Sequence, residues 1–344
     1  MIVHQAIGRS TNRRTGWIVG IVLALAAILV LATPSFAQAP PEKADNVATK
    51  KKKQKPVSTR ELPPSAAARA AAGPAPSQTS DTAQGTQAQN PLTPLWGVIN
   101  ENYTNFKMGP LEKTQNTLIV EPVIPLKLSP EWNLITRWNT PIAYMPRLAN
   151  PMGPIPGSDP DFGLSNMQPQ FFFTPKPTPL GSGSFAWAIG PSLWLPTASN
   201  NTLGINKWGG GPVAIALTTQ GPLLAGFLAQ NIWAGSQSSL PGQHVNALTV
   251  MPFVFYNFPG GWFVTYRPLI TADWTVDSHH RWTVPVGGGF GRVFPVGDMV
   301  MDVHAQVFYN GLTAPAAGMT NVGKWTAMLV IHFLSPGDRV PSLF

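Results

Sequence analysis

From Asn90 onwards, the sequence consists of segments of about 10–13 residues in which apolar and polar side chains alternate. In residues 117–128 one parity is wholly apolar, whereas the other parity carries Glu121 and Lys127. The same pattern recurs in residues 132–142, 262–274 and 299–310. Alternation with a period of two is typical of a β-strand with two chemically different faces. The sequence therefore predicts an all-β fold for this part of the chain.

The alternation fits either a soluble sandwich with an apolar interior or a membrane barrel with an apolar exterior. Aromatic residues near the segment ends favour the barrel, because membrane barrels carry aromatic girdles at both interfaces. The residues concerned are Trp132, Tyr144, Trp187, Trp194, Trp208, Trp233, Trp262, Trp274, Trp282 and Trp325. We therefore expect an antiparallel transmembrane β-barrel.

The connections give the expected strand number and orientation. Twelve strands are predicted, starting near residues 96, 115, 132, 162, 184, 208, 222, 245, 261, 281, 299 and 323. Short links near 129–131, 219–221, 258–260 and 294–298 alternate with longer ones at 106–114, 146–161, 197–207, 235–244 and 311–322. Two links are exceptions, since 176–183 is intermediate in length and 275–280 is modest. Outer-membrane barrels have short periplasmic turns and longer external loops. An even strand number leaves both termini on the periplasmic side. The first segment, 96–105, alternates weakly, so a plug or cap remains an alternative for it.

Prolines within the predicted strands conflict with a continuous ladder, because proline cannot donate a backbone hydrogen bond. They are Pro122, Pro125, Pro141, Pro169, Pro191, Pro212, Pro252, Pro268 and Pro285. Bulges can absorb some of them. The remaining prolines predict strands that are shorter or broken.

The net charge of +8 is concentrated at the N-terminus. Residues 1–88 hold 11 Lys/Arg and 4 Asp/Glu, whereas residues 89–344 hold 12 and 11. A nucleic-acid-binding domain carries its positive charge on the fold, so nucleic acid is excluded as a partner. The chain has no cysteine, which excludes disulfides and thiolate chemistry.

The N-terminus has the pattern of an export signal. Arg9, Arg13 and Arg14 precede an apolar run from 17 to 32, and small residues follow up to Ala37. This predicts a signal peptide over residues 1–37. The alternative is an uncleaved anchor, but the apolar run of 16 residues is shorter than the roughly 20 that a spanning helix needs.

Residues 38–88 are rich in Lys, Pro and Ala and poor in large apolar side chains. Such a segment cannot bury enough surface to offset its ordering entropy, so we expect a disordered linker. Its block of Lys50 to Lys53 either binds anionic envelope components or is a solvated spacer. Residues 89–344 form the predicted barrel domain.

The stretch from Asn90 to Leu334 resembles a bacterial outer-membrane transporter family associated with the MetA pathway of phenol degradation. The matching phrases include residues 102–106 (NYTNF), 131–137 (EWNLITR), 167–175 (MQPQFFFTP), 190–198 (GPSLWLPTA), 207–214 (KWGGGPVA) and 281–286 (RWTVPV). The resemblance implies an outer-membrane barrel that passes aromatic or other small hydrophobic compounds. It supplies no catalytic residues. The tail after Leu334 departs from the family pattern.

Motifs for catalysis or cofactor binding are absent from the sequence. It contains no P-loop, no G-x-S-x-G elbow and no H-E-x-x-H. The run from Gly287 to Gly291 lies in a predicted strand, where it makes room in the barrel or marks a bulge. His279, His280, Asp159 and Asp161 fall in predicted loops and are too few to define a metal site. No Ser/His spacing singles out a lipase. We expect no enzyme activity, cofactor or metal.

The polar parity of the strands predicts which charged residues line the lumen, because Lys or Arg facing lipid at the midplane costs about 2–4 kcal/mol. They are Glu121, Lys127, Arg137, Arg267, Asp273, Asp302, His304 and Lys324. Acidic and basic groups are nearly balanced, which predicts salt-bridged networks across a constricted pore. The expected function is passive or facilitated passage of small solutes. The alternatives are an interaction barrel whose loops or linker bind a partner, and a lipid enzyme.

Overall fold

The computed structural model describes residues 78–109, 111–146, 160–235, 244–279, 281–312 and 323–335. The predicted signal peptide and the linker up to Ser77 lie outside the described residues. The elements are α3 (Gln78–Gln89), β1 (Trp96–Met108), β2 (Lys113–Lys127), β3 (Trp132–Met145), β4 (Asp161–Leu164), β5 (Gln168–Pro175), β6 (Thr178–Leu180), β7 (Gly183–Trp194), β8 (Gly209–Gln220), β9 (Leu223–Ala234), β10 (Val245–Asn257), η1 (Pro259–Gly261), β11 (Trp262–Tyr266), β12 (Ile270–Asp273), β13 (Trp282–Val296), β14 (Met299–Leu312) and β15 (Trp325–Ser335).

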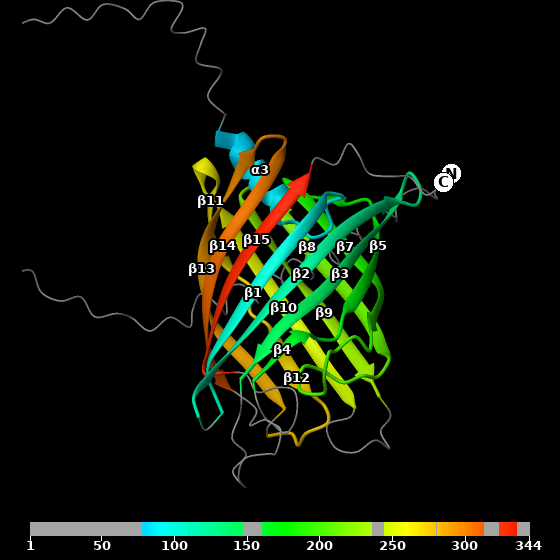
Figure 1. Ribbon diagram of the computed structural model, residues 1–344. Helices are drawn as coiled ribbons and strands as arrows, with labels where there is room; N and C mark the ends of the chain where they lie inside the picture. The colour runs from blue at the N-terminus through cyan, green and yellow to red at the C-terminus, as the bar shows by residue number, and fades with distance from the viewer. Residues whose placement is uncertain are drawn as a thin grey trace, which may run out of the picture. The chain divides into compact units, whose positions relative to one another are not determined.

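These segments form one antiparallel sheet that closes on itself (Figure 1). β4, β5 and β6 together occupy one position in the wall, between β3 and β7, and β11 and β12 share another, between β10 and β13. The barrel therefore has twelve strands, as predicted. β1 pairs with β15 from Trp96↔Ser335 to Phe106↔Trp325, so the first and last strands of the chain close the barrel. Every predicted strand start lies within two residues of an observed one.

One predicted loop is wrong. The sequence predicts a long link at 106–114, but β1 runs to Met108 and β2 begins at Lys113. Gly109 has a φ of 60°, and the Glu112 amide donates to its carbonyl at 3.1 Å. This positive φ lets the chain reverse at once, so the strands extend into the residues expected to form a loop.

The prolines are accommodated by local interruptions of the sheet. Between β2 and β3, pairing skips Glu121 and Pro122 and resumes at Val123↔Arg137. The register shifts between Val284 and Pro285 in β13. At Pro268 the strand ends, which separates β11 from β12. These prolines thus lie where pairing is already interrupted, so their missing N–H groups leave fewer ladder hydrogen bonds unmade.

The outer face of the barrel is apolar in its middle and aromatic towards both ends. Outward residues in mid-strand include Ile189, Val264, Val286, Phe290, Val307 and Leu329. Aromatic pairs flank this band, with ring centroids 6.0 Å apart for Trp132–Trp187 at one end and for Trp274–Trp282 at the other. An apolar band between aromatic girdles fits a lipid bilayer. The chain is an outer-membrane β-barrel. No helix among the described residues is long and apolar enough to span a membrane.

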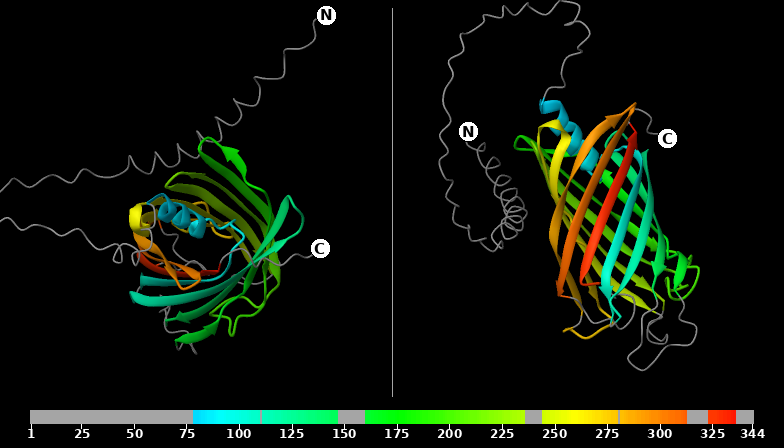
Figure 2. Two further views of the ribbon diagram at one scale, coloured as in Figure 1. Left: turned by 90° about the horizontal axis from the view of Figure 1, so that it is seen from above. Right: turned by 60° about the vertical axis from the view of Figure 1, so that its left-hand side comes forward.

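Helix α3 lies at the mouth of the barrel, next to the short hairpin turns (Figure 2). Gln89 and Asn257 exchange two side-chain hydrogen bonds, at 2.9 and 3.0 Å, and both are buried. A Cβ on Gly85 would lie 2.5 Å from Asn257 Oδ1, so glycine permits this close approach. An isolated helix of 12 residues is marginal in water.

Residues 78–88, which the sequence assigns to a disordered linker, instead belong to a helix that contacts the barrel. The helix stops at Asn90, whose side chain accepts from the Leu92 amide at 2.9 Å. Leu92 then inserts into the apolar cluster of the barrel interior.

Candidate functional site: a divided lumen

Two buried ion pairs lie about halfway along the lumen. Arg137 Nε donates to Glu121 Oε1 at 2.5 Å, and its Nη2 contacts the same oxygen. Arg267 Nη2 donates to Glu101 Oε1. The four side chains are 5–9% exposed. We call Glu101, Glu121, Arg137 and Arg267 the ion-pair layer.

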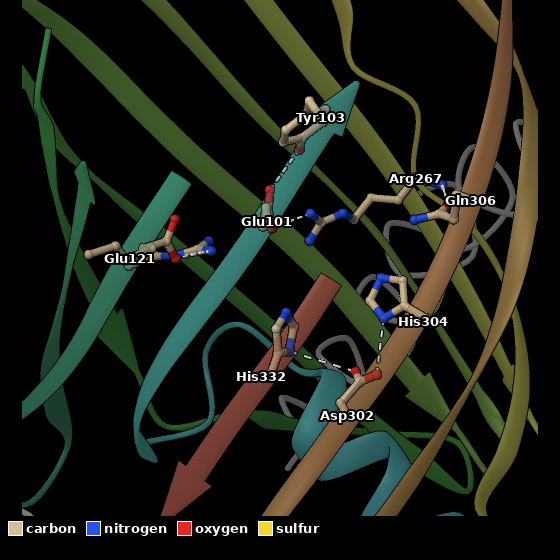
Figure 3. A network of polar contacts seen from close by, with 9 residues as sticks. Glu101, Tyr103, Glu121, Arg267, Asp302, His304, Gln306 and His332 are labelled. Carbon is tan, nitrogen blue, oxygen red and sulfur yellow. Dashed lines mark hydrogen bonds and ion pairs between the residues drawn. The ribbon is translucent and has the colours of Figure 1, made fainter. Parts of the chain in front are cut away.

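The ion-pair layer draws its members from separate parts of the wall (Figure 3). Glu101 and Glu121 lie on the neighbouring strands β1 and β2, at positions whose side chains point inward. Tyr103 follows on the same face as Glu101 and donates its hydroxyl to Glu101 Oε2 at 2.6 Å. Each carboxylate thus has a charged partner, and Glu101 has a second donor. This satisfies groups that are costly to bury.

Arg267 enters the lumen from the break between β11 and β12. Since the strand is interrupted there, its backbone amide has no ladder partner and donates to Gln306 Oε1 at 3.0 Å. The adjacent Pro268 needs no donor partner. The proline that prevents a continuous strand therefore places the arginine where it reaches across the lumen to β1.

A second polar cluster lies beside the ion-pair layer, on β14 and β15. Asp302 Oδ1 is 3.0 Å from His304 Nδ1, and Asp302 Oδ2 is 3.7 Å from His332 Nδ1 (Figure 3). His304 also packs edge-on against Phe263, with ring centroids 5.5 Å apart. The side chains of Asp302 and His304 have no solvent-exposed surface.

The ion-pair layer separates two spaces. On the side of the long loops, a cavity of about 780 Å³ extends from Met108 and Met145 at the rim down to Glu101 and Glu121. On the side of α3, a chamber of about 50 Å³ is lined by Ala88, Gln89, Ile99 and Val123, among others. Arg137 and Arg267 line both spaces. We call the first space the outer cavity and the second the inner chamber.

The loop between β7 and β8, residues 195–208, folds over the outer cavity. Asn166 Nδ2 donates to the carbonyls of Leu195 and Ile205, at 2.6 and 2.7 Å, and so bridges both limbs of the loop. Asp161 accepts from Asn200 at 3.0 Å and from Thr202 at 2.5 Å. Residues 201–205 consequently line the cavity.

The structure places the eight predicted lumen residues in two groups. Glu121, Arg137, Arg267, Asp302 and His304 are buried inside the barrel. Lys127 lies exposed at the end of β2 on the α3 side, and Lys324 lies exposed just before β15. Asp273 is half-buried at the end of β12, where its Oδ1 accepts from the Thr275 amide at 2.8 Å. These three residues lie at the rims. Alternation predicts that a side chain points inward, but it does not predict how far along the barrel axis the residue lies.

Sequence reasoning missed Glu101, Tyr103 and His332. The first two lie in the segment whose weak alternation allowed a plug or cap. A signal was available, because Glu101, Tyr103 and Asn105 share one parity, and a lone carboxylate within a strand should face the lumen. His332 shares its parity with Val330 and Leu334, so nothing in its own strand marks it as part of a polar cluster.

The described residues offer little for catalysis. No cluster of three or more His, Cys, Asp or Glu residues among them fits a metal ion. Asp161 is held by the 195–208 loop, whereas Asp159 and His280 lie outside the described residues. Within 78–335, apart from its undescribed loops, no serine hydroxyl is hydrogen-bonded to a histidine.

Comparison with known proteins gives fold-level likeness. An outer membrane channel from Pseudomonas putida has 12% identity and a TM-score of 0.47, covering 70% of this chain and 96% of the other. Outer membrane phospholipase A from Escherichia coli has 12% identity and a TM-score of 0.39, covering 74% and 98%. A FadL homologue from Pseudomonas aeruginosa has 10% identity and a TM-score of 0.23, covering 70% and 88%. No family model matches the chain, and no curated protein matches it.

Proposed function

We propose that this outer-membrane barrel is a conduit for small solutes that enter the outer cavity and cross the ion-pair layer. The observation that carries the proposal is the division of the lumen into two spaces with Arg137 and Arg267 between them. A barrel of about eight strands is filled by side chains, and about sixteen strands leave an aqueous channel. Twelve strands leave room for a cavity and one partition.

The outer cavity suits small amphipathic compounds better than ions. Its walls mix apolar groups, such as Leu228, Met251 and Phe308, with neutral amides and hydroxyls. Its volume of about 780 Å³ falls in the range of small-molecule sites. Aromatic or other hydrophobic compounds with one polar group are the substrates we propose.

Passage requires the ion-pair layer to move. Its pairs are held by few, well-defined contacts, so a truncated arginine leaves a gap that solutes can use. The test is swelling of proteoliposomes diluted into isosmotic solutions of uncharged sugars of graded size, for the wild-type chain, Arg137→Ala and Arg267→Ala. We expect slow swelling for wild type and at least severalfold faster swelling for either variant. Equal rates in all three folded proteins would refute a conduit through this layer.

A barrel without transport is the second candidate, favoured by the docking of α3 at the mouth through Gln89 and Asn257. In that function the network only stabilises the fold, and residues 38–77 present a binding segment to envelope partners. An absence of swelling in every variant, together with capture of one envelope component by residues 38–89, would support it.

A further inference from the structure

Three glutamines meet on the wall of the outer cavity, although they come from strands that are not neighbours. Gln168 and Gln170 lie on β5, and Gln230 lies on β9. Gln230 Oε1 accepts from Gln168 Nε2 at 3.0 Å and from Gln170 Nε2 at 2.8 Å. Gln168 Nε2 also donates to Ser192 at 3.0 Å. We call Gln168, Gln170 and Gln230 the glutamine cluster.

The cluster can form because the strands between β5 and β9 carry small residues at this level. Ser192 on β7 faces Gly211 on β8 in the register. A Cβ on Gly211 would lie 1.8 Å from the Asn231 carbonyl. Glycine therefore permits β8 and β9 to approach closely, and beside the short side chain of Ser192 this brings the amides of β5 and β9 within reach of one another.

The glutamine cluster keeps hydrogen-bonding capacity towards the cavity. Within the described residues, no hydrogen bond engages the carbonyl oxygens of Gln168 and Gln170 or the amino group of Gln230. All three side chains line the cavity. The cluster therefore presents two acceptors and one donor group next to the apolar Leu228 and Met251.

The charged side chains that line the same cavity already have ion-pair or hydrogen-bond partners within the chain. Glu101 is paired with Arg267, Glu121 with Arg137, and Asp161 is hydrogen-bonded by Asn200 and Thr202. An ionic ligand would have to displace one of these partners, whereas an uncharged ligand would not. Recognition by side-chain amides that still have free hydrogen-bonding groups consequently favours neutral ligand groups over ions.

We propose that the glutamine cluster is a recognition site for the uncharged donor–acceptor group of a small amphipathic solute, a carboxamide or a hydroxyl. The apolar part of the solute packs on Leu228 and Met251. This recognition site extends the proposed conduit function and depends on it for its biological role. Binding at the site is measured separately from transport.

The test uses benzamide as the probe, with benzoate and benzylammonium as charged probes of nearly the same shape. Binding is measured by calorimetry on the full chain in phosphatidylcholine nanodiscs, with empty discs subtracted. Benzamide should bind at least tenfold more tightly than either ion. Gln170→Leu and Gln230→Leu should each weaken benzamide about threefold to tenfold, because a neutral hydrogen bond contributes about 0.5–1.5 kcal/mol. Gln220→Leu, at the end of β8 on the opposite rim, is the matched control and should bind as wild type.

The proposal is overturned if benzoate or benzylammonium binds as tightly as benzamide, or if the cluster variants, folded as judged by heat-modifiable mobility, bind as the control does. Proteoliposome swelling in benzamide separates this result from the conduit itself. If the wild-type proteoliposomes swell but Gln170→Leu and Gln230→Leu bind benzamide as tightly as wild type, the recognition site alone is refuted. Binding as expected, without swelling in wild type or in the arginine variants, refutes the conduit alone.

Discussion

At the residue scale, the ion-pair layer shows why charged groups persist inside a membrane barrel. Arg137 and Glu121 are almost completely buried, and each is the principal partner of the other. Removing one member leaves an uncompensated buried charge, whereas removing both leaves a gap that apolar groups can fill. The free energy of unfolding is therefore expected to fall more when one member of the pair is removed than when both are removed.

We expect Arg137→Met to lower the free energy of unfolding by about 3–5 kcal/mol, because Glu121 is left buried and unpaired. The double variant Arg137→Met/Glu121→Leu should recover most of this loss. Urea unfolding of the protein in phosphatidylcholine vesicles measures both. The exposed pair Lys176–Glu131, 3.1 Å apart, provides the control, since Lys176→Met should change stability by less than about 1 kcal/mol. A double variant as unstable as the single one would contradict this account of the pair.

The lipid face gives a second prediction at this scale. Phe290 lies mid-strand in β13 and is 64% exposed. Phe290→Arg should cost about 2–4 kcal/mol, because the guanidinium then faces the centre of the bilayer. Val296→Arg, at the end of the same strand, should cost only about 0–1 kcal/mol. The same urea titration compares the two, and equal costs would show that the barrel is not placed in the membrane as described.

At the scale of elements, α3 is a helix whose stability comes from its docking site. Its Gly85 is unfavourable for a helix but is needed for the approach to Asn257. Helix propensity and docking therefore predict opposite effects for a larger residue at this position.

We expect Gly85→Leu to accelerate amide hydrogen exchange across Gln78–Gln89, although leucine is intrinsically the better helix former by nearly 1 kcal/mol. The added side chain would clash with Asn257 and undock the helix. Hydrogen-exchange mass spectrometry measures the rates. Gln87→Ala, on the exposed side of the helix, should leave them unchanged or slower. Slower exchange in Gly85→Leu would show that propensity, and not docking, maintains α3.

The strands were largely predictable from the sequence, whereas the helix and the depth of the site were not. Alternation identifies which parity faces the lumen because a single-residue shift would place Glu121 or Asp302 in lipid. It contains no information on how far along the barrel a residue lies, so it predicts the same lumen position for Lys127 and Lys324 as for Arg137. Residues 78–89 have no apolar face, and their order depends on a partner surface formed by η1 and the end of β10, where Asn257 lies 168 residues after Gln89.

At the scale of the whole molecule, the lumen consists of two compartments. The outer cavity holds the glutamine cluster, the ion-pair layer forms its floor, and α3 lies beyond the inner chamber. The absence of cysteine makes this arrangement directly measurable, because any introduced thiol is the only one in the chain.

Thiol accessibility from the cell exterior tests the central claim most directly. Thr117 and Val123 both point inward from β2, one into the outer cavity and the other into the inner chamber. With a small membrane-impermeant thiol reagent added to intact cells, Thr117→Cys should react rapidly and Val123→Cys at least tenfold more slowly. Adding Arg267→Ala should accelerate the reaction of Val123→Cys and leave that of Thr117→Cys unchanged. Equal reaction rates at both positions in the otherwise wild-type chain would contradict a lumen divided by the ion-pair layer.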